Sequence, residues 1–314
     1  MNANQTSIRA FAPATVANVA CGFDVMGFAV ESPGDEVEIT LTDTEGVSIK
    51  EITGDEGLLP LNADENTVSA VIKSYLKHIG KEKLGVAISL HKKMPLKSGL
   101  GSSAASSVVG VYALNQLLGC PLTDEALLPF AMEGEMLACG AAHADNVAPA
   151  LLGGFVLVRS YSPLDVIKLN TPTDLYCALV HPHIDVKTKD ARSILKKDIS
   201  LQKAIVQWGN VGGLVAGLMM EDYDLIKRSL HDEIIEPIRS ILIPGFEQIK
   251  AKALSLGALG ASISGSGPTT FALCKGKEKA HEVSKAMKEI YTELAIDSET
   301  FVSKVTQSGP QIIS

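Results

Sequence analysis

The sequence has no run of Lys or Arg, and its 28 basic residues are outnumbered by 36 acidic ones, which gives a formal net charge of -8. A nucleic acid or an anionic membrane is therefore an unfavourable partner. No apolar run is long enough to cross a membrane, and the polar N-terminus MNANQTS lacks the apolar core of a signal peptide. These absences lead us to expect a soluble cytoplasmic protein.

Cysteine is also scarce, and no two cysteines stand in a CxxC pair. In a chain of this size, scattered cysteines favour buried, reduced thiols over a disulfide framework or a zinc site. The five are Cys21, Cys120, Cys139, Cys177 and Cys274.

There are no internal repeats and no low-complexity segments. Hydrophobic residues make up 46% and charged residues 20% of the 314 positions, a typical globular composition that allows one large or two ordinary domains. The segment 161–173 contains Pro163 and Pro172 and is the expected boundary. We therefore divide the chain into residues 1–165 and 166–314.

Periodicity predicts mixed helices and strands in the first half. Strands are expected over 8–14, 35–41, 85–95 and 151–160, and helices over 66–78, 103–118 and 123–139. In the second half we expect strands at 174–182, within 258–274 on both sides of a Gly-Ser turn, and at 301–306. Helices are expected at 201–220, 246–257 and 277–294. This order is typical of a ferredoxin-like arrangement.

The stretch PLKSGLGSSAAS, residues 95–106, lies between an expected strand and an expected helix. The free backbone N–H groups of a helix N-terminus favour anions, and Gly99 and Gly101 allow a close backbone approach. The hydroxyls of Ser98, Ser102 and Ser103 add donors. The pattern GxxxxGK[ST] is missing, so this is not a P-loop. The residues alone leave two interpretations, a phosphate cradle or an ordinary Gly-rich turn.

The string GLGSSAA strongly resembles the phosphate-binding motif of the superfamily of galactokinases, homoserine kinases, mevalonate kinases and phosphomevalonate kinases (GHMP kinases). Two further motifs resemble that superfamily in the right order, APATVANVACGFDVMG at 12–27 and GASISGSGPTTFAL at 260–273. Within it, HADNVAPALLGG at 143–154 and IIEPIR at 234–239 resemble the homoserine kinase branch.

The resemblance implies an α+β fold of two domains. Residues 1–165 would form the ATP-binding domain and residues 166–314 a ferredoxin-like domain. The implied activity is ATP- and Mg²⁺-dependent phosphorylation of the hydroxyl of L-homoserine, on the route to threonine, in a chain that forms a homodimer. The implied ATP-binding residues are Pro95, Leu96, Lys97, Ser98, Gly99, Leu100, Gly101, Ser102, Ser103, Ala104, Ala105 and Ser106.

The resemblance also implies which residues hold the amino acid: Asn18, Asp24, His143, Arg192 and Arg239. The chemistry is sensible, because an acid suits the ammonium and the planar fork of Arg suits the carboxylate. Without the motifs, Asp24 could be a helix cap, Arg239 a surface ion-pair residue and His143 a satisfied loop or core histidine.

For the phosphoryl transfer, the resemblance implies Ser103 and Glu135 as metal ligands and Thr188 near the γ-phosphate, while Glu135 alone could be a solvated helix carboxylate. The pair Asp145-Asn146 falls at the catalytic position, with Asn where mevalonate kinases have an Asp. An amide is not a useful base at neutral pH, so we expect no dedicated protein base. Two alternatives stay open, a mevalonate-type kinase and a non-catalytic nucleotide or amino-acid sensor.

The sequence indicates the roles of several other residues only weakly. The superfamily usually has a small residue where this chain has Lys97, which we expect to point to solvent. Asn66 and Lys92 or Lys93 are weak candidates for the adenine pocket. The Gly-Ser turn at 262–269 is expected to pack against the phosphate loop, and His181 and His183 are expected to have a loop role rather than to bind metal.

Overall fold

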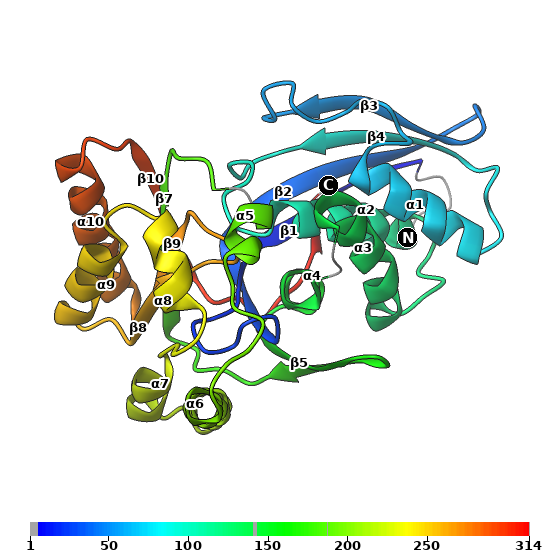
Figure 1. Cartoon of the computed structure of the whole chain (residues 1–314). Coiled ribbons are helices and arrows are strands. Elements are labelled where there is room, and N and C mark those ends of the chain that lie inside the picture. Colours follow the sequence, from blue (N-terminus) through cyan, green and yellow to red (C-terminus); the bar gives the residue numbers. More distant parts are fainter. Residues whose placement is uncertain (1–5, 141–142, 187, 314) are drawn as a thin grey trace.

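The computed structural model describes residues 6–140, 143–186 and 188–313, and builds two sheets with helices packed against them (Figure 1). The first sheet has the order β11-β1-β2-β4-β3, and β5 pairs with both β2 and β6. Its strands are β1 Ser7–Ala17, β2 Met26–Thr42, β3 Val47–Thr53, β4 Gly85–His91, β5 Phe155–Tyr161, β6 Leu164–Leu169 and β11 Gln311–Ile312. Only the β3–β4 pair is parallel among the described ladders.

Helices cover one face of this sheet (Figure 1). They are α1 Thr67–His78, α2 Ser102–Leu117, α3 Asp124–Cys139 and α4 Ala144–Leu152. α1 begins where the sequence predicts, because the Asn66 side chain accepts a hydrogen bond from the Val68 N–H. α2 has no distinct polar face and is buried between the sheet and its neighbours, and its side chains are mostly small or apolar, serines included.

The second sheet has the order β10-β7-β9-β8. It consists of β7 Leu175–Pro182, β8 Gly260–Ile263, β9 Thr270–Lys275 and β10 Ser298–Lys304, with α9 Phe246–Ser255 and α10 Lys277–Glu293 packed against it. Every described pair is antiparallel, and the order is the one expected for a ferredoxin-like sheet. The remaining helices are α5 Thr188–Ser193, α6 Leu201–Met220, α7 Tyr223–Ser229, α8 Glu236–Arg239 and the 3-10 turn η1 Ser240–Leu242.

A shared apolar core joins the two sheets. Phe28 of β2 stacks on Phe155 of β5 with ring centroids 4.6 Å apart, and meets Phe271 of β9 edge-on at 6.0 Å. All three rings are fully buried. The two-domain fold is therefore held together by packed aromatic side chains as well as by the connecting chain.

One local prediction is wrong, and one segment expected to contain a domain boundary holds a strand. The sequence predicts that Leu151 and Leu152 begin a strand, but they end α4, and the strand starts only at Phe155, after two glycines with positive φ. The proline-containing segment 161–173, expected to be a domain boundary, holds β6, which forms a hairpin with β5. The prolines mislead because Pro163 lies in the hairpin turn, where no ladder hydrogen bond is required.

The described cysteines are free, as the sequence predicts. Cys21, Cys177 and Cys274 are buried, but Cys120 is exposed, so the expectation of burial is wrong at that position. Cys120 follows the end of α2 in a surface turn, which a sequence pattern based on apolar residues does not reveal. The side chain of Cys139 lies outside the described residues.

Candidate functional site

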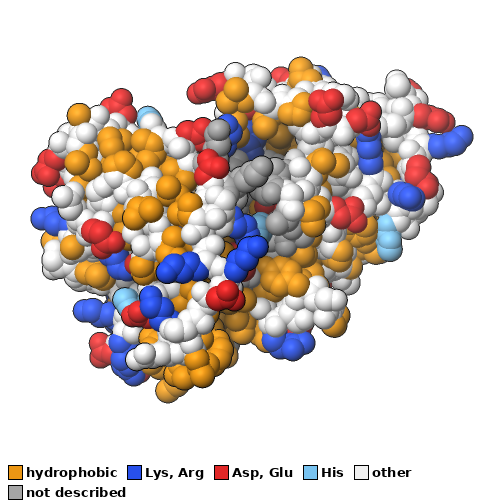
Figure 2. Space-filling view, in the orientation of Figure 1, with side chains coloured by type: hydrophobic (Ala, Val, Ile, Leu, Met, Phe, Trp, Pro, Cys, Tyr) orange, Lys and Arg blue, Asp and Glu red, His pale blue; other side chains and the backbone are white. Residues whose placement is uncertain are grey.

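A cavity of about 630 Å³ lies where the phosphate-loop segment, the N-terminus of α1 and the segments around α5 and α8 meet. Lys and Arg side chains gather near the middle of this face in Figure 2. Most of the candidate residues line the cavity: Asn18, Asp24, Leu96, Lys97, Ser98, Gly99, Gly101, Ser102, Ser103, Ser106, Glu135, His143, Asp145, Asn146, Thr188, Arg192 and Arg239. Leu100, Ala104 and Ala105 are instead fully buried, and they pack in the core behind the loop.

The glycines of the phosphate loop are required by close backbone contacts. Gly99 has φ +82°, and a Cβ there would lie 2.4 Å from the Ser264 carbonyl oxygen. Gly101 has φ +67°, and its Cβ would lie 2.0 Å from Thr15 Oγ1. Both the N-terminal and the C-terminal motif thus press against this loop, as expected for the Gly-Ser turn. No side chain caps α2 at Gly101, so its first N–H groups face the cavity.

The three hydroxyls expected to bind phosphate have different partners. Ser98 Oγ accepts a hydrogen bond from the Leu100 N–H at 3.3 Å, and Ser102 Oγ donates to Asp35 Oδ2 at 2.9 Å. Ser103 Oγ is buried and has no hydrogen-bond partner among the described residues. Of the three, Ser103 is therefore the hydroxyl without a partner in the described chain, while Ser98 accepts a hydrogen bond and keeps its own O–H donor.

An ion pair beneath the loop is not predicted from the sequence. Lys92 at the end of β4 donates to Asp35 of β2, to Ser106 Oγ at 2.6 Å and to the Ser102 carbonyl at 3.0 Å. The Lys92 and Asp35 side chains are 2% and 0% exposed. Burial lowers the pKa of Lys92, and the charge of Asp35 opposes this effect. All three ammonium protons are used within the chain, which argues against Lys92 as an adenine ligand.

The Asp35–Lys92 pair anchors the start of α2 to the sheet. Asp35 also accepts the Lys93 N–H at 2.9 Å, so one carboxylate holds both the segment entering the phosphate loop and the helix leaving it. In the sequence, this pair is indicated only by Asp35, a charged residue within an expected strand. That position does not identify Lys92 as its partner, because Lys92 lies 57 residues further along the chain.

The segment 18–24 has an unusual backbone. Asn18, Val19, Ala20 and Asp24 all have positive φ, a costly conformation for residues other than glycine. Asn18 Nδ2 donates to the Gly265 carbonyl at 2.7 Å, and Asn18 Oδ1 accepts the Asp24 N–H at 3.1 Å. The Asn18 side chain thus bridges the first and last motifs and fixes the position of Asp24.

Asp24 and two arginines meet over the ring of Phe23. Arg192 donates to both carboxylate oxygens of Asp24, at 2.6 and 3.3 Å. Arg239 donates from Nε to the Ala191 carbonyl at 3.0 Å and from one terminal nitrogen to the Gly265 carbonyl at 3.2 Å. The Arg192 and Arg239 guanidinium carbons lie 5.6 and 4.9 Å from the Phe23 ring centroid. Arg192 and Arg239 both line the cavity.

His143 lies beside this cluster. Its Nδ1 is 3.7 Å from Asp24 Oδ1, and its Nε2 is 3.5 Å from Arg192. Burial lowers the pKa of His143, the charge of Asp24 opposes this, and Arg192 and Arg239 lower it further. The imidazole is therefore held in its neutral form near neutral pH, where it can donate or accept a hydrogen bond.

The pair Asp145-Asn146 begins α4. Asp145 is fully buried, and burial, with the charges of Asp24 and Glu135 adding to it, raises its pKa to about 7. Its Oδ1 has no hydrogen-bond partner among the described residues. Asn146 Oδ1 accepts a hydrogen bond from Thr15 Oγ1 at 2.8 Å, which leaves the amide nitrogen as the group available to a ligand.

Oxygen donors suited to a hard cation lie on the phosphate side. Glu135 of α3 is 4% exposed and lines the cavity together with Ser103. Mg²⁺ in kinase sites typically takes one or two protein oxygens besides phosphates and water, and this pair fits that pattern. Among the described residues no group of three or more His, Cys, Asp and Glu could hold a metal alone. Thr188, at the start of α5, faces Ser266 Oγ at 3.1 Å.

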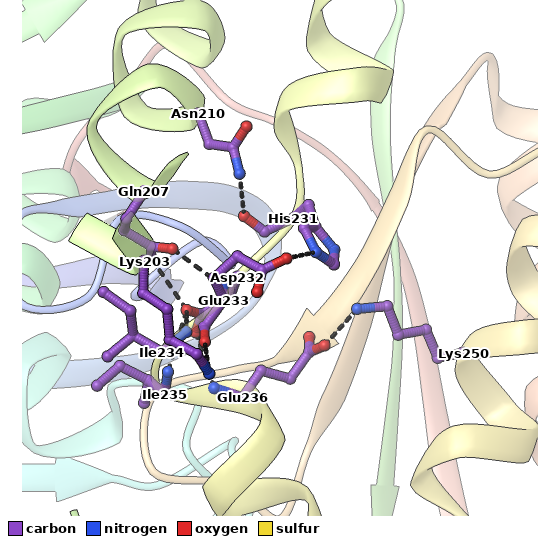
Figure 3. Close-up of polar contacts among 10 residues, drawn as sticks. All are labelled: Lys203, Gln207, Asn210, His231, Asp232, Glu233, Ile234, Ile235, Glu236 and Lys250. Atoms are coloured by element: carbon purple, nitrogen blue, oxygen red, sulfur yellow. Dashed lines mark hydrogen bonds and ion pairs between the residues drawn. The ribbon is translucent and has the colours of Figure 1, made fainter. Parts of the chain in front are cut away.

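Gln207 and Asp232 support the segment that carries Arg239, and sequence reasoning does not find either (Figure 3). Asp232 is buried and accepts the N–H groups of Ile234, Ile235 and Glu236 at 2.8–3.1 Å, which caps α8. Gln207 of α6 donates to Asp232 Oδ1 at 3.0 Å and to the Cys21 carbonyl at 2.8 Å. α6 thus connects the segment that carries Asp24 to the one that carries Arg239.

Comparison with known proteins identifies the family of the chain. The descriptions "GHMP kinases N terminal domain" and "GHMP kinases C terminal" match residues 66–154 and 213–293. A homoserine kinase of Chloroherpeton thalassium is 51% identical over 316 residues, covering 98% of this chain and 99% of its own. A homoserine kinase of Chlorobaculum tepidum is 50% identical over 320 residues, covering 98% of each.

A crystal structure of homoserine kinase from Cytophaga hutchinsonii superimposes with a TM-score of 0.97 at 60% identity, over 100% of this chain and 99% of that one. This chain belongs to the homoserine kinases of the GHMP kinase family. A mevalonate kinase from L. major shares the fold, with a TM-score of 0.72 at 17% identity over 94% of this chain and 95% of that one.

Membership of the homoserine kinases confirms the resemblance, the fold class and the kinase activity expected from the motifs. It also favours the main interpretation over the mevalonate-type alternative.

The structure shows the positions of two further residues, Lys97 and His181, for which the sequence provides only weak indications. Lys97 is exposed at the cavity with φ +56°, the left-handed region that glycine adopts at less cost. His181 is buried, and its Nδ1 lies 3.1 Å from Thr269 Oγ1, which fits a loop role.

Proposed function

We propose that this kinase transfers the γ-phosphoryl group of ATP to the side-chain hydroxyl of L-homoserine and releases O-phospho-L-homoserine, a step on the route to threonine. The observation that carries the proposal is the Asp24–Arg192–Arg239 cluster, which shares one cavity with the phosphate loop. A zwitterionic amino acid has an ammonium that suits Asp24 and a carboxylate that suits the two arginines. Its ammonium replaces Arg192 on Asp24, and its carboxylate then takes the guanidinium groups.

On the nucleotide side, the open N–H groups of α2 and the loop 95–106 bind the phosphates. Ser103 and Glu135 would hold Mg²⁺, which supplies neutralisation of charge on the β- and γ-phosphates. Thr188, at the start of α5, contacts the γ-phosphate.

A cytoplasmic location suits an ATP-dependent enzyme whose described cysteines are free. We also propose that the kinase acts as a homodimer.

Asn146 and His143 hold the homoserine hydroxyl in line with the γ-phosphorus. A bond forms between the hydroxyl oxygen and phosphorus as the bond to the β–γ bridging oxygen breaks. The proton of the hydroxyl passes to a phosphate oxygen or to water, since the loose transition state of phosphoryl transfer needs little activation of the nucleophile. The protein's own contribution is alignment and electrostatic stabilisation.

The substrate assignment is tested by ADP release with ATP and Mg²⁺ over a panel of homoserine, mevalonate, galactose and threonine. We expect turnover with homoserine. Activity with mevalonate but not with homoserine would contradict the assignment, because mevalonate has no ammonium for Asp24. Binding of nucleotide and amino acid without turnover of any compound would indicate a sensor.

Arg239→Leu is expected to raise the KM for homoserine about tenfold or more, since it removes one charged hydrogen-bond partner of the carboxylate. The KM for ATP should stay within about twofold. Steady-state ADP release measures both constants. Arg228→Leu, at an exposed position on α7, is the matched control. An unchanged KM for homoserine would remove Arg239 from the site.

Asn146→Ala is expected to lower kcat about 100-fold, the effect of losing alignment of a reacting group, with a smaller change in the KM for homoserine. Single-turnover measurements separate this effect from product release. If Asp145→Asn lowered kcat many-thousand-fold while Asn146→Ala had little effect, Asp145 would be the catalytic base and the hydroxyl proton would pass to its carboxylate.

A further inference from the structure

Thr15 lies where β1, α2 and α4 pack against one another (Figure 1). Its backbone N–H donates to the Leu100 carbonyl in the phosphate loop at 3.0 Å. Its Oγ1 donates to Asn146 Oδ1, at the start of α4, at 2.8 Å. Thr15 is 0% exposed and does not line the active-site cavity, whereas Asn146 does. Any effect of the Thr15 hydroxyl on a bound substrate therefore passes through a neighbouring residue.

Close backbone contacts hold both partners of this hydrogen bond. The ladder between β1 and β2 shifts register just before Thr15, and such an irregularity redirects a side chain relative to a regular strand. A Cβ on Gly101 would lie 2.0 Å from Thr15 Oγ1 and 2.9 Å from Asn146 Oδ1, so the bonded pair lies directly against the start of α2. A Cβ on Gly27 of β2 would lie 1.8 Å from the Asp145 carbonyl oxygen, so the start of α4 lies against the sheet.

The Thr15 hydroxyl distinguishes the two ends of the Asn146 amide. A carboxamide has an acceptor oxygen and a donor nitrogen of nearly the same shape, so its hydrogen-bond partners decide which way it faces. A hydroxyl has one proton, and Thr15 donates it to Asn146 Oδ1. Turning the amide over would leave that buried proton without this acceptor, which is costly. The hydroxyl thus holds the amide oxygen, and the nitrogen is the end left for the cavity.

The end of the amide that faces the cavity matters for phosphoryl transfer. An amide N–H donated to the hydroxyl oxygen of the amino acid uses one lone pair of that oxygen. The other lone pair stays available to phosphorus, and the proton stays free to pass to a phosphate oxygen or to water. An amide oxygen in the same place would accept the hydroxyl proton in a hydrogen bond, yet an amide cannot take up that proton at neutral pH. The nitrogen is therefore the end that assists the transfer.

We propose that Thr15 is a positioning residue of the kinase reaction, which holds the Asn146 amide with its nitrogen toward the hydroxyl of the amino acid. This role rests on the proposed function, in which Asn146 aligns the homoserine hydroxyl. The backbone hydrogen bond from Thr15 to Leu100 also sets the amide relative to the loop that is proposed to bind the phosphates. One buried threonine thus connects the group that aligns the acceptor with the loop that holds the donor.

Thr15→Val removes the hydroxyl and keeps the shape of the side chain. In single-turnover and steady-state ADP release with homoserine, we expect kcat to fall about tenfold, because the amide is still present but samples both orientations. The KM values for ATP and for homoserine should stay within about twofold. Thr15→Ser keeps the donor and should retain kcat within about twofold, and Thr15→Cys, whose thiol is a weaker donor, should lie between the two.

Two comparisons separate positioning from packing. Val fills the buried site as Thr does and Ser does not, so a merely structural role would make Thr15→Ser the more impaired variant. In the Asn146→Ala background, Thr15→Val should change kcat by less than about twofold, because no amide is left to orient. Thr40→Val is the matched control. Thr40 lies on the neighbouring strand β2, donates to Ser7 Oγ at 3.2 Å and does not line the cavity, so kcat and both KM values should be unchanged.

Equal falls in kcat from Thr15→Val with and without the Asn146 amide would overturn the proposal, as would a Ser variant as slow as the Val variant. So would a Val variant with the kcat of the wild type or, should Val prevent folding, a Cys variant with that kcat. A higher KM for ATP at unchanged kcat would assign Thr15 to the phosphate loop alone.

The two proposals fail in different ways. If Asn146→Ala keeps the kcat of the wild type, the proposed function of Asn146 is wrong. If Asn146→Ala is slow and Thr15→Val is not, the role of Asn146 stands and only that of Thr15 is wrong.

Discussion

Lys92→Met is expected to destabilise the protein by about 3–5 kcal/mol, because it leaves the Asp35 carboxylate buried without its counter-charge. Asp35 would keep its hydrogen bonds from Ser102 Oγ and the Lys93 N–H, but these do not replace the ammonium. The midpoint of urea unfolding, followed by circular dichroism, measures the loss.

The double variant Asp35→Asn with Lys92→Met tests the cause. Removing both charges should recover much of the lost stability, since the cost arises from the unpaired carboxylate. Lys93→Met, at the exposed neighbouring position, should change the midpoint little. If Lys92→Met were as stable as the wild type, the pair would not be a buried anchor of α2.

Asp145→Asn is expected to stabilise the folded protein near neutral pH, unlike Lys92→Met, which is expected to destabilise it. The pKa of Asp145 is raised from 3.8 to about 7, so between these pH values the folded protein keeps a proton that the unfolded chain releases. The wild type therefore loses stability as pH rises from about 4 to 7. At 1.36 kcal/mol per pKa unit the loss is about 4 kcal/mol, and the Asn variant avoids it.

Unfolding midpoints of both proteins at about pH 4.5, 6 and 8 measure this difference. The variant should gain on the wild type as pH rises, while Asp43→Asn, at an exposed position, should show no such trend. A constant difference across the series would mean that Asp145 is not the group responsible. A gain would mark Asp145 as a residue retained for function at a cost in stability.

The Asp145 carboxylate should also make the binding of homoserine depend on pH. Asp145 and Asp24 both line the cavity, and the charge of Asp24 disfavours that of Asp145. An ammonium placed between them stabilises both charges, so homoserine should bind more tightly as pH rises through about 7. The KM for homoserine between about pH 6 and 8 measures this effect, and the Asp145→Asn variant should lack it.

Much of the fold could be predicted from the sequence where the signal is local. The helix over 66–78 is marked by the Asn66 cap and an apolar face. The strand expected over 85–95 is marked by its apolar residues, although β4 ends at His91. Where local signals conflict, prediction fails. Prolines in 161–173 indicate a break, but β6 gains its stability from pairing with β5, which the segment itself does not encode.

The candidate site divides in the same way. The motif residues Asn18, Gly99, Ser103 and Arg239 could be named in advance, because a contiguous string with glycines at fixed offsets specifies a backbone path. Their supports Asp35, Gln207 and Asp232 could not be, and Lys92 was a candidate only for the adenine pocket. Each lies outside the motifs, and a hydrogen bond between segments 25 to 186 residues apart leaves no spacing rule to find.

The sequence by itself determined the family, most of the long helices and several of the strands, and the phosphate loop, because these depend on residues that are neighbours in the chain. Only the tertiary structure decided that Asp145 is desolvated, that Lys92 pairs with Asp35 and which apolar side chains of α6 are buried and which are exposed. The physical reason is that burial and charge pairing are sums over atoms from distant segments, and those atoms come together only when the two sheets pack.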